Sequence, residues 1–83
     1  MKTKISRRLV NEVIRLESKE PFDVDNHSFA LSMVHEYCRS NGLWYVNYMD
    51  IPSLAYDGLR NGAKEEDIIK GIELILNCEV VYE

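Results

Sequence analysis

Apolar residues recur at helical spacing from the start of the chain. Four of them fall on one side of a helix with 3.6 residues per turn: Ile5, Leu9, Val13 and Leu16. The opposite side is basic and polar, with Lys4, Arg8, Asn11 and Arg15, and Arg7 lies beside it. The pattern predicts an amphipathic helix over residues 3–19.

A second helix is predicted after a polar loop. Residues 18–26 contain Pro21, and we expect Phe22 and Val24 to fasten this loop to the core. Asp25 or Asn26 is a suitable N-cap, and the helix ends at about Asn41, before a glycine that tolerates the left-handed conformation. Apolar residues cover about half of its circumference, which predicts the most buried helix of the protein: Phe29, Ala30, Met33, Val34, Tyr37 and Cys38.

Two further helices follow in the second half of the chain. Asp50 and Pro52 start the third, which ends at 61–62, and the small residues Ala55 and Gly58 favour a close helix approach. The fourth runs from Glu65 to about residue 77, with acidic residues in its first turn that complement the helix dipole. Its inner stripe is predicted to be Ile68, Ile72 and Ile75, and Leu74 falls outside it.

Two short segments have the alternation of strands. Residues 43–49 are aromatic and β-branched, and residues 78–82 place apolar side chains on alternate positions. We expect these two segments to pair as a two-stranded sheet. The predicted fold is therefore α+β and mostly α, one domain over residues 1–83, with four short helices around one small core. That core is predicted to contain Leu9, Val13, Phe29, Met33, Leu59, Ile68 and Ile72.

Composition and charge narrow the class of protein. The 83 residues carry a net charge of −4, 46% of them are apolar, and no apolar run is long enough to span a membrane. The basic N-terminus is not followed by the apolar segment of a signal peptide, so we expect a cytoplasmic protein without a membrane partner. Residues 1–15 hold five bases and one acid, whereas the remainder holds five bases and 13 acids, a balance that disfavours broad binding of nucleic acid.

The sequence indicates neither an enzyme nor a metal or cofactor site. It contains no glycine-rich phosphate loop and no Gly-x-Ser-x-Gly. On one helix, His27 and Cys38 lie about 16 Å apart along the axis, so only His35 and Cys38 are close enough to ligate together, and a structural zinc needs four ligands. We expect Cys38 and Cys78 to be buried structural thiols.

Residues 54–72 have the rhythm of a helix-turn-helix. A DNA-binding unit of this kind inserts the start of its second helix into the major groove. Here that turn is Glu65-Glu66-Asp67, whose carboxylates repel phosphates. The rhythm therefore favours a plain helical hairpin.

An aromatic cluster is the most informative functional feature. Trp44, Tyr45, Tyr48 and Met49 lie within six residues, and Trp, Tyr and Met are enriched at protein interfaces. In a strand these side chains occupy both faces, which so small a domain does not easily bury. Either one face is an exposed adhesive patch, with an unpaired strand edge beside it, or all of these rings belong to the core.

The leading interpretation is a non-enzymatic protein-protein interaction module. Its size is typical of an accessory regulator or inhibitor, of the kind that a bacteriophage or mobile element uses against a host protein. The aromatic cluster supplies the anchor, and Glu65, Glu66 and Asp67 supply an acidic rim for steering. A homodimer through the same patch is a variant of this hypothesis.

The alternative belongs to a different class, a nucleic-acid-binding regulator that uses Lys4, Arg7, Arg8 and Arg15. Bases early in a helix oppose the helix dipole, so helix stability does not explain them. A third hypothesis is mimicry, in which the acidic residues imitate nucleic-acid phosphates and occupy a basic groove.

Overall fold

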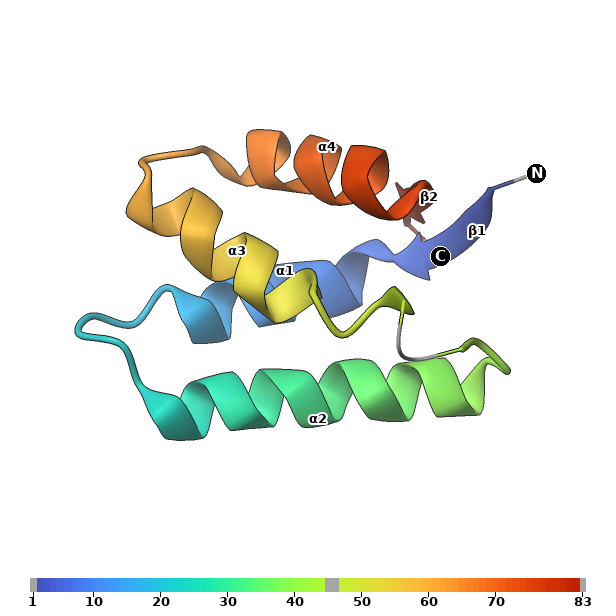
Figure 1. Ribbon diagram of the computed structural model, residues 1–83, viewed down its shortest axis with the longest axis horizontal. Coiled ribbons are helices and arrows are strands. Elements are labelled where there is room, and N and C mark those ends of the chain that lie inside the picture. The colour runs from blue at the N-terminus through green and yellow to red at the C-terminus, as the bar shows by residue number, and fades with distance from the viewer. Residues whose placement is uncertain (1, 45–46, 83) are drawn as a thin grey trace.

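The computed structural model describes residues 2–44 and 47–82. In chain order its elements are β1 (Thr3–Ser6), α1 (Arg7–Glu17), α2 (Val24–Ser40), α3 (Ile51–Arg60), α4 (Glu65–Leu76) and β2 (Cys78–Val81). α1 and α3 lie in the middle, α2 runs along one side and α4 along the other (Figure 1). This is the mostly α, α+β fold that the sequence predicts.

The chain begins with a strand, which corrects the predicted helix start at residue 3. β1 pairs in parallel with β2 in a two-stranded sheet, with Thr3 opposite Cys78 and Ser6 opposite Val81. Ser6 then caps α1, its hydroxyl accepting a hydrogen bond from the Leu9 amide at 3.4 Å. A parallel pair needs a long connection between its strands, and here that connection is the stretch of chain that contains all four helices.

The predicted pairing of residues 43–49 with 78–82 is wrong, although the second segment does form β2. The described part of 43–49 is coil, a 3₁₀ residue at Asn47 and turn, and residues 45 and 46 lie outside the described residues. This segment is the connection that returns from the end of α2 to the start of α3 (Figure 1). The strand partner comes instead from the N-terminus.

The most buried helix is α1, not α2. α1 packs against both α2 and α3, so residues on most of its circumference are covered: Leu9, Val10, Val13, Ile14, Leu16 and Glu17. α2 lies at the periphery and buries only Ala30, Val34 and Cys38. The predicted core residue Phe29 is 62% exposed on its outer side, whereas Met33 packs against the core partly buried.

The start of α2 also differs from the expectation. The N-cap is Asp23, whose carboxylate accepts a hydrogen bond from the Asn26 amide at 3.0 Å. Phe22 and Val24 are 46% and 65% exposed, so they do not anchor the loop in the core. The Phe22 ring instead packs edge-on against Tyr56 of α3, with ring centroids 5.1 Å apart, and holds the loop from outside.

α3 and α4 confirm the predicted close approach. A Cβ placed on Gly58 would lie 2.7 Å from Cγ1 of Ile68, so the glycine allows an approach of the two helices that a larger residue would reach only by displacing Ile68. The buried stripe of α4 runs through Ile68, Ile69 and Ile72, because α4 covers β2 as well as α3. Ile75 is consequently 62% exposed, contrary to the prediction, whereas Leu74 is exposed as expected.

Candidate protein-binding surface

The structure separates the predicted aromatic cluster. Trp44 is 66% exposed, Tyr48 is buried, and Met49 packs against the core half-buried. Tyr45 lies outside the described residues. Since the described part of the segment is not a strand, Trp44 and Tyr48 do not share a face. Among the described members of the cluster, only Trp44 presents a large apolar surface to water.

The position of Trp44 is fixed by its neighbours. Leu43 packs against the core, and its amide donates a hydrogen bond to the Cys38 carbonyl at 2.8 Å. The Trp44 carbonyl accepts a hydrogen bond from the Asn47 amide at 3.2 Å. The buried Tyr48 follows, and its carbonyl accepts from the first residue of α3. The indole therefore lies between two hydrogen-bonded backbone groups, the amide of Leu43 and the carbonyl of Trp44.

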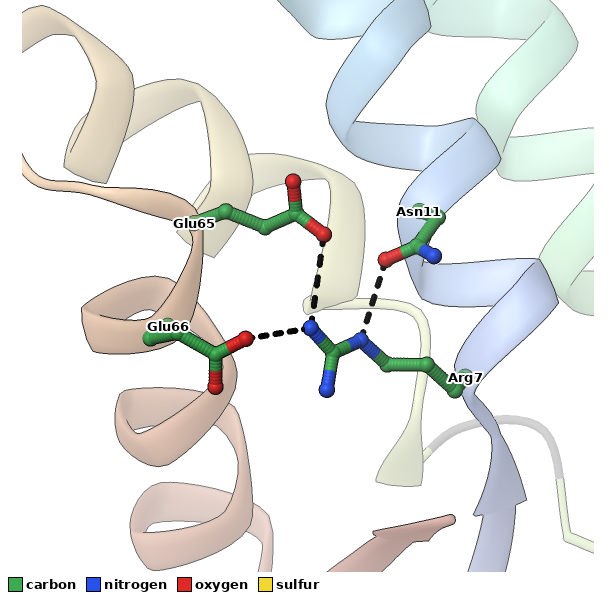
Figure 2. Close-up of polar contacts among 4 residues, drawn as sticks. All are labelled: Arg7, Asn11, Glu65 and Glu66. Carbon is green, nitrogen blue, oxygen red and sulfur yellow. Dashed lines mark hydrogen bonds and ion pairs between the residues drawn. The ribbon is translucent and has the colours of Figure 1, made fainter. Parts of the chain in front are cut away.

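Two members of the predicted acidic rim, Glu65 and Glu66, form ion pairs with Arg7 of the same chain. Nη2 of Arg7 lies 2.5 Å from a carboxylate oxygen of Glu66 and 3.4 Å from one of Glu65, while Nε donates to the Asn11 side chain at 3.1 Å (Figure 2). The guanidinium carbon also lies 5.2 Å from the ring centroid of Tyr82. Arg7 thus joins the start of α1 to the first turn of α4 and to the segment after β2.

This cluster changes the assignment of both predicted charged sites. The hydrogen bond that Arg7 donates to Glu66 raises the pKa of Arg7, and the Arg7 side chain is only 12% exposed. Arg7 is therefore not presented to a phosphate, whereas Glu65 and Glu66 pair with it and still keep side chains that are 50% and 66% exposed. Asp67, the third acidic residue of this turn, is exposed.

The remaining basic residues form only a sparse surface. Arg15 pairs with Glu12 one turn earlier, and Nε of Arg15 donates to that carboxylate at 2.8 Å. This hydrogen bond lowers the pKa of Glu12. Lys4 and Arg8 are exposed. Two of the four bases of the nucleic-acid hypothesis are thus neutralised by carboxylates of the same chain.

Both edges of the two-stranded sheet carry side-chain caps. On β1, the Ser6 amide donates to the Tyr37 hydroxyl of α2 at 3.1 Å. On β2, the Val80 amide donates to the Glu73 carboxylate of α4 at 2.8 Å. A partner strand binds to an edge strand through backbone groups that have no hydrogen-bond partner. These two contacts occupy one such group on each edge, and they therefore disfavour binding by strand addition.

A buried acid lies at the end of α1, which sequence reasoning missed. The Glu17 carboxylate is 2.6 Å from Nδ1 of His27, and the side chain of Glu17 is 1% exposed. The ten-residue separation spans the loop before α2, so only the folded loop brings the pair together. Within residues 2–44 and 47–82, no three His, Cys, Asp or Glu side chains are arranged to hold a metal ion.

Both cysteines are free and buried, as predicted. Burial raises the pKa of the Cys38 and Cys78 thiols, which keeps them protonated and weakly nucleophilic at neutral pH.

The chain matches no family model, no curated protein and no solved structure. In the part of the chain that the structure describes, none of the helices combines the length and the apolar character that crossing a membrane requires. The candidate site therefore depends on the geometry of the chain itself.

Proposed function

We propose that this protein is a non-enzymatic interaction module that binds another protein through Trp44. The observation that carries the proposal is an indole that is 66% exposed although the Leu43 amide before it and the carbonyl of Trp44 itself are hydrogen-bonded. A tryptophan side chain has only two rotatable torsions, so ordering it on binding costs little conformational entropy. Tryptophan is also among the residues most enriched at interface hot spots.

The exposed part of the indole is large enough to matter energetically. Aromatic side chains bury about 150–250 Å² when covered, so the 66% that remains exposed corresponds to roughly 100–165 Å². At about 25 cal/mol per Å², covering it contributes about 2.5–4 kcal/mol before the costs of association. Before these costs are subtracted, that free energy is equivalent to about two to three orders of magnitude in affinity.

The biological role that fits this reading is an accessory regulator or inhibitor that acts by covering a surface of its partner. The net charge of −4 favours a partner whose contact surface is basic. Glu65 and Glu66 are not assigned to the contact, because Arg7 holds them. Trp44 is the proposed point of contact.

The test is affinity capture from nuclease-treated lysate with three proteins: the native chain, Trp44→Ala and Phe29→Ala. Phe29 is a matched control because it is similarly exposed, at 62%, on a different element. Circular dichroism first establishes that both variants are folded. We expect a stoichiometric protein partner with the native chain and Phe29→Ala, and its loss with Trp44→Ala.

Two results would contradict the proposal. Capture that is unchanged in Trp44→Ala places the contact elsewhere. Binding of nucleic acid in untreated lysate, with an affinity that falls steeply as salt is raised, transfers the function to the basic residues Lys4 and Arg8.

A further inference from the structure

The chain contains two Asn-Gly pairs, and each ends a helix at the surface. Asn41-Gly42 follows α2 and Asn61-Gly62 follows α3, and all four residues are exposed. In such a pair the backbone nitrogen of the glycine can attack the side-chain amide carbon of the asparagine, because glycine has no side chain to obstruct the approach. Both pairs therefore carry the groups for a spontaneous covalent modification.

The reaction is a deamidation whose only co-reactant is water. The glycine nitrogen forms a bond to Cγ of the asparagine and gives up its proton, and Nδ2 leaves with that proton as ammonia. The resulting five-membered imide ring is then opened by one water. Opening at Cγ gives aspartate, whereas opening at the backbone carbonyl carbon gives isoaspartate, in which the main chain runs through the side-chain carbons.

The folded helix ends hold both pairs out of the reactive geometry. ψ is 9° at Asn41 and 7° at Asn61, so the glycine nitrogen eclipses the backbone nitrogen of the asparagine and is turned away from its Cβ. Each Nδ2 also donates to the carbonyl four residues earlier, at 2.8 Å to Tyr37 and at 2.9 Å to Asp57. Ring closure therefore requires the helix end to open locally.

The attacking amide is held less firmly at the first pair. The Gly42 nitrogen lies 3.4 Å from the Arg39 carbonyl oxygen that accepts its hydrogen bond, whereas the Gly62 nitrogen lies 3.1 Å from that of Leu59. Since N–H···O hydrogen bonds in proteins span about 2.7–3.2 Å, the Gly42 amide is the weaker donor and the more readily freed nucleophile.

The chain that follows each pair increases this difference. α4 begins at Glu65, soon after the second pair, and packs against α3, so rotation at Asn61 must displace one packed helix from the other (Figure 1). After the first pair the next helix begins only at Ile51, so rotation at Asn41 displaces a connection rather than a helix. We propose that Asn41 is a site of spontaneous deamidation, which the folded chain modifies in preference to Asn61.

The modification should loosen the end of α2. A carboxylate at position 41 cannot donate to the Tyr37 carbonyl as the Asn41 amide does. It also adds a negative charge at the C-terminus of a helix, where the helix dipole disfavours it.

The test is peptide mapping by mass spectrometry of the purified native chain, incubated at mildly alkaline pH for increasing times. Asn61 is the internal control, because it has the same glycine neighbour in the same molecule. In the folded chain we expect conversion at Asn41 to be several-fold faster than at Asn61, with isoaspartate among the products. In concentrated urea, where neither helix end exists, the two sites should react at similar rates.

Equal conversion of the two sites in the folded chain, or faster conversion at Asn61, overturns the proposal. It is also overturned if neither site is converted in the folded chain over the time in which both react in urea. A preference for Asn41 that persists unchanged in urea would contradict it as well, because the preference would then come from the neighbouring residues and not from the helix ends.

Discussion

The same substitution, glycine to alanine, should have opposite effects at two helical positions. In a helix interior alanine is favoured over glycine by about 0.8–1 kcal/mol. At Gly71 an added Cβ meets nothing within 4 Å, so Gly71→Ala should realise most of this gain. We expect its free energy of unfolding to rise by about 0.5–1 kcal/mol.

At Gly58 the added Cβ has no room. It would lie 2.7 Å from Cγ1 and 3.3 Å from Cδ1 of Ile68, and Ile68 is 5% exposed between the two helices. Forcing an extra methyl into a packed core costs about 1–3 kcal/mol, which exceeds the helical preference. Gly58→Ala should therefore lower the free energy of unfolding by about 1 kcal/mol, although alanine is a better helix former than glycine.

The assay is urea unfolding followed by circular dichroism, at a concentration where the chain is monomeric. The difference between the two variants should equal the steric cost, about 1–3 kcal/mol. In an Ile68→Ala background, Gly58→Ala should instead become stabilising, since the obstructing side chain is gone. Equal stability of the Gly58→Ala and Gly71→Ala variants would refute the close packing of α3 on α4.

Three further predictions concern polar contacts. Arg7→Met should lower the midpoint of thermal unfolding, because it removes the ion pairs that join α1 to α4. Arg8→Met, an exposed control, should leave the midpoint unchanged. Equal midpoints in the two variants would argue against a role of Arg7 in joining these helices. The hydrogen bond from Lys19 holds the pKa of Asp23 below its ordinary value, so the unfolded state binds the proton of this carboxyl at a higher pH than the folded state does. The stability that Asp23 contributes should be complete above about pH 5 and lost as pH falls through the folded-state pKa. Asp23→Asn should flatten this acid limb of a stability-against-pH curve, and an unaltered limb would contradict the assignment. Glu73→Ala should speed hydrogen exchange at the Val80 amide, and Glu73→Gln, which keeps an acceptor, should restore protection; equal exchange in both variants would show that the cap is absent.

Local signals determine where the helices begin and end. Gly42 and Gly62 take positive φ angles of 67° and 78° after α2 and α3, as their place in the sequence predicts. Pro52 falls in the first turn of α3. These positions are predictable because the relevant energies depend on neighbouring residues only.

Long-range contacts account for what the pattern could not predict. Ile5 fits the apolar stripe of a helix as well as it fits a strand, and only its pairing partner Val80, 75 positions later, decides between them. Phe29 belongs to an apolar arc wider than the face that a peripheral helix buries. In both cases the local pattern is compatible with two structures, and tertiary packing selects one.

The candidate site was predictable only in part. The residue type alone singles out Trp44 as a candidate, whereas its separation from Tyr48 depends on the turn that replaces the expected strand. Arg7 gave a different signal, since a base in the first turn of a helix is unfavourable to the dipole and needs another explanation. That explanation is Glu66, whose place 59 residues later is visible only in the fold.

Site-specific crosslinking tests the central claim most directly. A photoreactive side chain replaces Trp44 in one protein and Phe29 in another, and both are irradiated in cells that contain the native partner. The account predicts a discrete crosslinked protein from position 44 and none from position 29. Crosslinking from position 29 alone, or from neither position, would contradict the assignment of Trp44 as the binding anchor.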